Sequence, residues 1–470
     1  MNPEELTNLT VVEAASYIAK KTISPVDLLD AYLKRIERLE PQLNAFILRL
    51  DSYAMEKAKT AEREIVAGNY RGPFHGIPIG VKDLFWTEGI ATSSGSILEA
   101  SFVPKEDSAA VANFYRAGSY CIGKLHMSEF AFNGTSRNHH YGPSKNPWDF
   151  SKTAGGSSSG SAISVASQEA PIALGTDTGG SVRLPAALCG ITGIKPTFGL
   201  VSRFGVTPLS WSMDHVGVLS RTVHDGALAL NFLAGFDQRD PGSANTKKQD
   251  YTRDLDIPPR KLRIGVPKDF IWEVIDQDVK QAFWNSMTHM ESVGAEVKEM
   301  SIPFLELCNA AGSIVQTSEA AAYHHDNIIS QGDKYDPTIR RRIEVGLFIS
   351  AESYLQAQRV RYKCIKDMIS LFEDVDVIAT PTVSIGAPNL TDAWVQINGK
   401  EVTTREALLR ITRVFSTIGF PAISLPCGFT NEGMPVGLQL ASRPFSDAML
   451  AQTANFYQQT TSWHTQLPKL

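Results

Sequence analysis

The chain has 470 residues, of which 43% are hydrophobic and 20% are charged, and its formal net charge is -5. This composition is typical of a globular protein with a large core, and it excludes an intrinsically disordered chain. Since Asp and Glu outnumber Lys and Arg by 50 to 45, we expect no nucleic-acid partner. No apolar run reaches the roughly 18 residues of a membrane span, so we expect a cytoplasmic protein without a membrane partner.

Residues 1–70 are expected to form helices that carry no catalytic groups. Ser24 and Pro25 supply an N-cap and a proline at the first helical position. Apolar residues then recur at three- and four-residue spacing, and Pro41 is expected to end this helix. Another helix is predicted over 52–67, so this part of the chain is interpreted as scaffold.

The next candidate is a lysine. A strand is predicted over 77–81, and Lys82 follows at its end. A lysine near its reference pKa of roughly 10.4 is a charged donor that cannot accept a proton. Burial among hydroxyl groups would lower the pKa and leave a neutral amine able to act as a base, as in Ser-Lys catalytic sites. A solvated surface lysine is the alternative, and the apolar strand argues against it.

Two Gly-Gly-Ser turns, at 155–157 and 179–181, flank a predicted helix over 159–167 and a predicted strand over 170–176. Because glycine tolerates positive φ, successive N–H groups of such a turn can point into one concavity that binds an anion. A serine at the end of the turn is a candidate nucleophile with a built-in oxyanion hole. A tight Gly/Ser loop or a phosphate-binding turn would have the same residues, so the turns alone leave these alternatives open.

Other familiar motifs are excluded. Residues 156–160 fit G-x-S-x-G around Ser158, but the preceding residues 146–153 are polar and do not form the hydrophobic strand of a nucleophile elbow. A phosphate loop needs a lysine that follows neither glycine turn. The pairs His139-His140 and His324-His325 have no third ligand at a recognisable spacing. We therefore expect no metal and no cofactor.

Five cysteines are widely spaced, without a Cys-x-x-Cys pair. Such an odd, scattered set indicates buried free thiols in a reducing compartment. These residues are Cys121, Cys189, Cys308, Cys364 and Cys427.

Three motifs match those of one enzyme family. They are residues 80–83 (GVKD), the run GGSSSGS from Gly155, and residues 175–196 (GTDTGGSVRLPAALCGITGIKP). The two turn serines lie 24 positions apart, and the similarity extends over essentially the whole chain to residues 435–439. On these residues the chain resembles the amidase signature family.

The resemblance implies an α/β fold class, with a single large α/β/α domain around a central mixed β-sheet flanked by helices. It also implies a catalytic triad of the nucleophile Ser181, the bridging Ser157 and the base Lys82, with a cis peptide bond before Ser157. The implied oxyanion donors are the N–H groups of Thr178, Gly179, Gly180 and Ser181. A relay through the two hydroxyls to the amine would activate a weak nucleophile and, in reverse, protonate the leaving amine.

Residues near the triad have expected roles of their own. The position of the equivalents in related amidases implies that Phe130, Ala131 and Asn133 line the acyl pocket, although ordinary loop packing would also account for them. Asp214 and Arg183 are expected to fix the geometry of the serine loop through hydrogen bonds rather than to transfer protons.

One domain is expected over residues 1–470, because no long low-complexity linker interrupts the chain. Residues 71–234 form the expected signature core with the catalytic residues. The C-terminal part, 260–470, is expected to contain a mainly helical insertion at 313–372. The arginines at 340–342 are interpreted as a solvated face of that insertion.

The expected function is hydrolysis of a carboxamide C–N bond to a carboxylate plus ammonia or an amine. The expected partner is a small-molecule amide, and a homodimer stays open. Two alternatives remain: a glutaminase subunit of a tRNA-dependent amidotransferase, and a hydrolase of carbamate or urea-type substrates. Residues 318–324 and 354–361 resemble general amidases more than that subunit, which favours a stand-alone enzyme.

Overall fold

The computed structural model describes all 470 residues, which fold around one sheet of 11 strands. From one edge to the other, the strands are β1 (Phe46–Arg49), β3 (Tyr120–Leu125), β2 (Pro78–Lys82), β6 (Ile172–Asp177), β8 (His215–Ser220), β7 (Thr192–Lys195), β14 (Ala422–Phe429), β15 (Pro435–Ser442), β11 (Val377–Pro381), β9 (Arg263–Pro267) and β10 (Glu296–Met300). Strand β2 is parallel to both neighbours, as is β9, whereas the strands from β6 through β15 to β11 pair antiparallel. The sheet is therefore mixed, as predicted.

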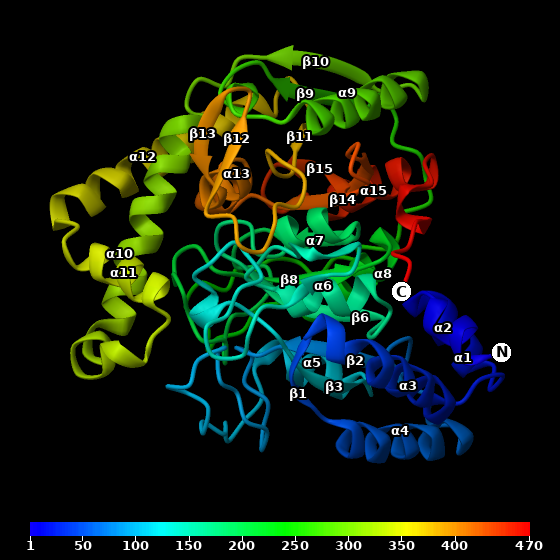
Figure 1. Cartoon of the computed structure of the whole chain (residues 1–470). Helices are drawn as coiled ribbons and strands as arrows, with labels where there is room; N and C mark the ends of the chain where they lie inside the picture. Colours follow the sequence, from blue (N-terminus) through cyan, green and yellow to red (C-terminus); the bar gives the residue numbers. More distant parts are fainter.

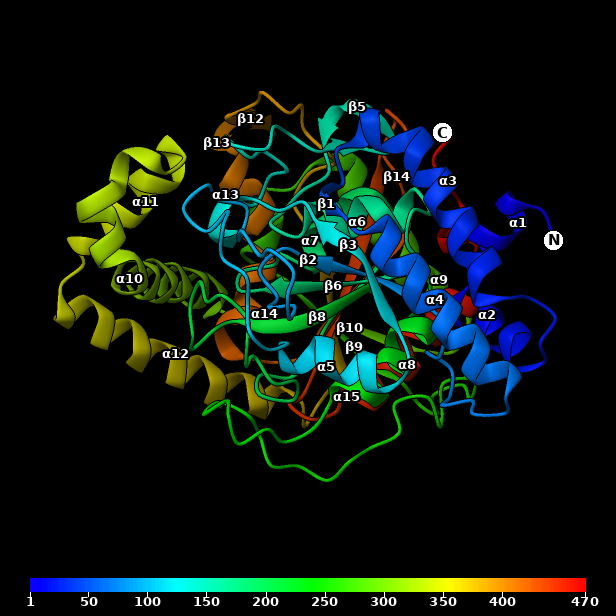
Figure 2. The same cartoon turned by 90° about the horizontal axis from the view of Figure 1, so that it is seen from below.

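Helices flank this sheet, which confirms the expected α/β class (Figure 1). In Figure 2, α6 and α7 lie on one side of the central strands, and α8 and α15 lie on the other. The helices are α1 (Pro3–Asn8), α2 (Val11–Ala19), α3 (Pro25–Leu43), α4 (Asp51–Val66), α5 (Ala109–Arg116), α6 (Ser159–Ala166), α7 (Arg183–Cys189), α8 (Val223–Leu233), α9 (Gln277–Ser292), α10 (Leu305–Gln331), α11 (Pro337–Leu347), α12 (Ala351–Leu371), α13 (Thr404–Leu409), α14 (Thr412–Ile418) and α15 (Asp447–Gln459). Two hairpins complete the fold, β4 (Lys145–Asn146) with β5 (Asp149–Thr153) and β12 (Trp394–Ile397) with β13 (Lys400–Thr403).

Two smaller clusters of 12 and 4 buried residues accompany one large hydrophobic core that holds these layers together. The large core contains 104 buried residues that run from Leu6 in α1 to Tyr457 in α15, so both ends of the chain contribute to one contiguous cluster. No helix combines the length and the apolar character needed to cross a lipid bilayer. All five cysteines are free and buried, as predicted.

Helices α10, α11 and α12 form a lobe that protrudes from the body of the molecule in both views (Figures 1 and 2). Helix α10 begins at Leu305 rather than near residue 313, where the helical insertion was expected. It joins the lobe to the body by packing closely against α14. A Cβ at Gly312 would lie only 1.9 Å from Thr417 Oγ1, so glycine is required where these two helices meet.

Pro41 does not end the first long helix, as the sequence had suggested. Helix α3 continues to Leu43, and Asn44 then adopts a left-handed conformation with φ of 53°. A proline removes only one N–H donor, and near the last turn of a helix that loss is tolerated. Strand β1, at one edge of the sheet, was also missed within the region expected to be helical.

Candidate active site

Lys82 lies at the end of β2, between β3 and β6, and is fully buried. Its Nζ atom donates hydrogen bonds to Ser157 Oγ at 2.7 Å and to Thr176 Oγ1 at 2.8 Å. Burial lowers the pKa of Lys82 to about 7, although the negative charges of Asp214 and Asp177 oppose this shift. The amine therefore exchanges protons near neutral pH and contacts one of the two predicted serines directly.

The first glycine turn places Ser157 beside this amine. Gly155 has a φ of 76°, and a Cβ there would lie 2.4 Å from a methyl carbon of Leu184. The peptide bond between Gly156 and Ser157 is cis, as the family resemblance implied. The Ser157 carbonyl accepts a hydrogen bond from the Ser128 amide at 3.3 Å. All three residues of the turn are buried.

The second glycine turn follows β6 and lies directly against the first. The Ser158 amide donates to the Ser181 carbonyl at 3.3 Å, which joins the two turns through their backbones. Gly180 has a φ of 137°, and a Cβ there would lie 2.2 Å from Thr412 Oγ1. The Ser181 side chain is 6% exposed, whereas Ser157 is completely buried. No hydrogen bond joins the two serine hydroxyls in this structure.

The four predicted oxyanion donors remain available. None of the N–H groups of Thr178, Gly179, Gly180 and Ser181 donates to a protein acceptor. The carboxylate of Asp177 instead accepts from the amides of Val182 and Arg183, which begin the following helix. Unpaired N–H groups on a glycine turn can bind an oxygen that carries negative charge.

Arg183 and Asp214 hold the second turn through hydrogen bonds, as predicted. Arg183 forms a fully buried ion pair with Asp177, in which Nη2 and Oδ1 are 2.8 Å apart. The charge of Arg183 helps to hold the pKa of Asp177 well below its usual value against the opposing effect of burial. Asp214 accepts a hydrogen bond of 2.6 Å from the Thr178 hydroxyl.

Two of the three predicted pocket residues, Phe130 and Ala131, lie in the 3-10 turn Glu129–Ala131 that comes after β3, and Asn133 follows this turn. Phe130 and Ala131 are buried and have left-handed φ values of 46° and 59°. The Phe130 ring packs against the imidazole of His324, with 4.4 Å between the ring centroids. Asn133 is partly buried, and its carbonyl accepts from the Ser128 hydroxyl at 3.3 Å. Ser128 therefore links this segment to the first glycine turn.

One histidine of each adjacent pair has an ordinary polar partner. His140 Nε2 lies 2.8 Å from Glu129, and His324 Nδ1 lies 3.0 Å from the Tyr335 hydroxyl. No group of three His, Cys, Asp or Glu side chains is arranged to hold a metal ion.

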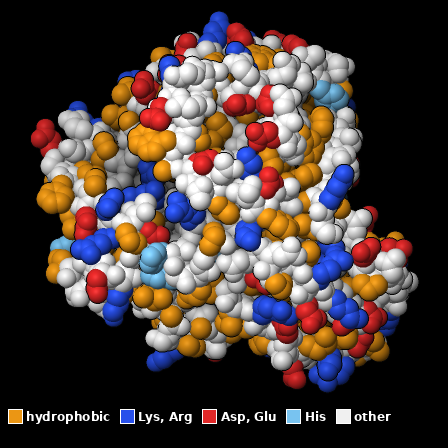
Figure 3. Space-filling view, in the orientation of Figure 1, with side chains coloured by type: hydrophobic (Ala, Val, Ile, Leu, Met, Phe, Trp, Pro, Cys, Tyr) orange, Lys and Arg blue, Asp and Glu red, His pale blue; other side chains and the backbone are white.

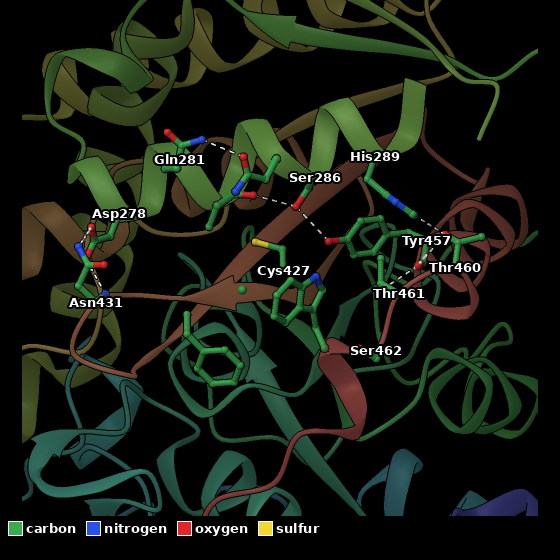
Figure 4. A pocket seen from close by; sticks show the side chains of 15 residues that line it. Asp278, Gln281, Ser286, His289, Cys427, Asn431, Tyr457, Thr460, Thr461 and Ser462 are labelled. Atoms are coloured by element: carbon green, nitrogen blue, oxygen red, sulfur yellow. Dashed lines mark hydrogen bonds between the residues drawn. The ribbon is translucent and has the colours of Figure 1, made fainter. Parts of the chain in front are cut away.

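A cavity of about 380 Å³ lies elsewhere, between α9, β14 and the C-terminal segment (Figure 4). Ser286 occupies its wall, where its hydroxyl contacts the hydroxyl of Tyr457 at 3.0 Å. No residue of the predicted triad, oxyanion hole or acyl pocket lines this cavity.

Sequence reasoning missed several groups at the site. Thr176, the second partner of Lys82, was treated only as the end of a strand, yet β2 and β6 are paired, and two strand ends side by side bring such hydroxyls near the lysine. Thr412 donates to the Gly179 carbonyl at 2.8 Å across a separation of 233 residues, for which the sequence holds no local signal. Arg342 was expected to be solvated but is partly buried and donates to the Phe132 carbonyl.

Fold and site together define a hydrolase of the amidase-signature class. The chain belongs to the amidase family, since the family model described as Amidase matches residues 27–451.

Individual relatives agree with this assignment. The A subunit of the glutamyl-tRNA(Gln) amidotransferase of Geobacter sp. (strain M21) is 36% identical over 487 residues, covering 98% of this chain and 99% of that protein. A solved structure described as an unexpected vestigial protein complex that reveals the origins of an s-triazine catabolic enzyme has a TM-score of 0.92 at 32% identity, covering 96% of this chain and 98% of that chain. A bacterial aryl acylamidase has a TM-score of 0.89 at 26% identity, covering 97% and 98%.

Proposed function

We propose that the chain cleaves amide C–N bonds by acyl transfer, with Ser181 as nucleophile, Ser157 as proton relay and Lys82 as base. The observation that carries this proposal is the buried Lys82 amine, which has two hydroxyl partners and a pKa lowered to about 7. Near neutral pH a large share of such an amine is uncharged and can accept a proton from the hydroxyl it contacts.

The proposed reaction begins when Ser181 Oγ attacks the substrate carbonyl carbon. The Ser181 proton passes to Ser157, and the Ser157 proton passes to Lys82. The unpaired N–H groups of residues 178–181 hold the oxyanion. The relay then returns a proton to the substrate nitrogen, the C–N bond breaks, and ammonia or an amine leaves. Water attacks the acyl-enzyme by the same route and releases the carboxylate; carbamate and urea-type carbonyls would follow the same steps.

Replacing the nucleophile tests this proposal. We expect Ser181→Ala to lower kcat for amide hydrolysis by about 10⁴-fold or more, because no other hydroxyl is proposed to form the acyl-enzyme. Ser164→Ala is the matched control, since this buried serine of α6 donates only within its own helix. Mass spectrometry after reaction with an acylating inhibitor should find the adduct on Ser181, and an adduct on a different serine would contradict the assignment.

A second candidate is the ammonia-producing subunit of a tRNA-dependent amidotransferase. The 36% identity to one such amidotransferase component over nearly the full length of both chains supports this candidate. This full-length identity is stronger support for the amidotransferase subunit than the resemblance of residues 318–324 and 354–361 to general amidases is for the stand-alone enzyme. Assaying the purified chain with simple aryl amides and with glutamine separates the two. Turnover of aryl amides by the chain alone favours the stand-alone enzyme, and glutamine hydrolysis that needs added partner proteins favours the other.

A further inference from the structure

Arg413, in α14, is a buried cation that the proposed proton relay does not use. The residue is 2% exposed, and its Nη1 donates to Asn309 Oδ1 at 2.8 Å. Its Nε and Nη2 are buried without any hydrogen-bond partner. A buried guanidinium is costly when its donors are unpaired, so the structure leaves a position that an anionic acceptor would complete.

The open donors lie beside the proposed oxyanion turn. An ideal Cβ at Gly179 would lie 3.8 Å from both Cγ and Nε of Arg413. The same point would be 3.5 Å from Oε1 of Gln316, which is also buried without a partner. Three sets of unsatisfied polar groups therefore converge here: the turn N–H groups, the guanidinium and the amide oxygen. Such convergence is typical of a ligand site.

Two further arginines surround Arg413. Burial, together with the charges of Arg405 and Arg342, lowers the pKa of Arg413 to about 9, which still leaves it charged at neutral pH. Arg342 reaches the Phe132 carbonyl beside the predicted acyl-pocket residues. Arg405 Nε is likewise buried and unpaired.

The carboxylates that face these three arginines are already engaged. Glu406 accepts from Arg410 at 3.4 Å, and Asp336 caps α11 by accepting from the Thr338 amide at 2.7 Å. The cluster therefore carries excess positive charge. Figure 3 shows a hollow between the protruding lobe and the body, with Lys and Arg side chains in and around it.

We infer that the substrate carries a carboxylate on its acyl part and that Arg413, aided by Arg342 and Arg405, binds it. The inference rests on the proposed function and narrows the substrate to monoamides of dicarboxylic acids. A guanidinium fork matches a carboxylate with two parallel hydrogen bonds. An ammonium group beside that carboxylate would add a fourth positive charge to those of the three arginines. We therefore expect the preferred acyl part to have a carboxylate but no ammonium group. The carboxylate bound by Arg413 takes no part in the reaction. At the other end of the acyl part, the amide C–N bond breaks and a bond from the carbonyl carbon to Ser181 Oγ forms.

Binding tests the inference without turnover. Titration calorimetry of the full-length Ser181→Ala variant should show glutaramate, the monoamide of glutaric acid, binding about 100-fold more tightly than butyramide. Adding Arg413→Gln should remove this preference. Arg340→Gln is the control, because this exposed arginine of α11 pairs only with Glu344 and has the same change in charge. Equal binding of the two amides would overturn the inference.

Kinetics with intact Ser181 tests the same point during turnover. We expect kcat/KM for glutaramate to exceed the values for butyramide and for glutamine. Arg413→Gln should lower the ratio of the glutaramate value to the butyramide value about 100-fold, and Arg340→Gln should leave this ratio unchanged. If this variant fails to fold, Arg342→Gln should lower the glutaramate value about tenfold. Faster turnover of butyramide or glutamine would overturn the inference, whereas full activity of Ser181→Ala would overturn the proposed function alone.

Discussion

Two buried lysines show how the partners of an amine decide its role. Burial lowers the pKa of both Lys82 and Lys195 to about 7. Lys82 donates to the hydroxyls of Ser157 and Thr176, whereas Lys195 donates to the carbonyl of Pro196 at 3.0 Å. A carbonyl oxygen has no proton to give, so only the first lysine can take part in a relay.

We therefore expect the pH profile of amide hydrolysis to report Lys82. Because the neutral amine is the reactive form, kcat/KM should rise about tenfold per pH unit below the pKa of about 7 and level off above it. Lys82→Ala should lower kcat by about 10³-fold or more. Lys195→Met should keep the inflection, provided that circular dichroism shows a folded variant. A profile that loses its inflection only in the Lys195 variant would contradict the proposed base.

At the scale of elements, the helical lobe forms hydrogen bonds with the loop at residues 210–214, which supports the second glycine turn. Glu319 of α10 accepts hydrogen bonds from the hydroxyls of Ser210 and Ser212, from the Ser212 amide, and from the Tyr354 hydroxyl of α12. The same loop contains Asp214, whose carboxylate holds Thr178. The lobe thus reaches the loop behind the proposed oxyanion donors through the Glu319 carboxylate and also through Arg361 of α12, which donates to the hydroxyl and the carbonyl of Ser212.

Removing that carboxylate should be far more damaging than removing one of its donors. We expect Glu319→Ala to lower the free energy of unfolding by about 2 to 4 kcal/mol, because it leaves several buried donors unpaired. Tyr354→Phe, which removes one hydrogen bond, should cost about 1 kcal/mol. Urea denaturation measures both, and kcat/KM should fall at least tenfold only for Glu319→Ala. Equal losses in the two variants would show that Glu319 does not organise the loop.

Sequence analysis located best the elements that lie in the motifs around Lys82 and the first glycine turn. The predicted strand at 77–81 and helix at 159–167 correspond to β2 and α6 within a residue or so. Strands β7 and β8 were missed. A Cβ at Gly217 of β8 would lie 2.6 Å from the Ile194 carbonyl oxygen of β7, so glycine is required there by a contact that only the folded sheet shows. Edge strand β10 was missed because its residues are mostly exposed and charged.

The residues of the candidate site also fall into two groups, those found from local motifs and those brought in from distant parts of the sequence. Lys82 and the two serines lie in short motifs that resemble those of the amidase signature family, and that resemblance implied their proximity. Arg413 and Thr412 reach the second turn from more than 200 residues away, and their role depends on how α14 packs against α10. Such contacts have no local signature, because they arise only when the whole sheet has formed.

At the scale of the whole molecule, one continuous core indicates one folding unit. The 104-residue hydrophobic cluster includes residues from the first helix and the last. We therefore expect a single calorimetric transition on heating, with the calorimetric enthalpy close to the van't Hoff enthalpy. Two resolved transitions, or a stable fragment of 260–470 after limited proteolysis, would show that the C-terminal part is a separate domain.

The second glycine turn depends on residues that are synthesised more than 200 positions after it. Thr412 and Ser416 bond to Gly179 and Asp177, and Gln439 accepts from Arg183. A nascent polypeptide that has emerged only as far as residue 400 would already contain Lys82 and both serines. It would lack the hydrogen bonds from residues 412, 416 and 439 that hold the second turn. Hydrolysis is therefore expected to begin only after residues 412–439 have been synthesised and have packed against the turn.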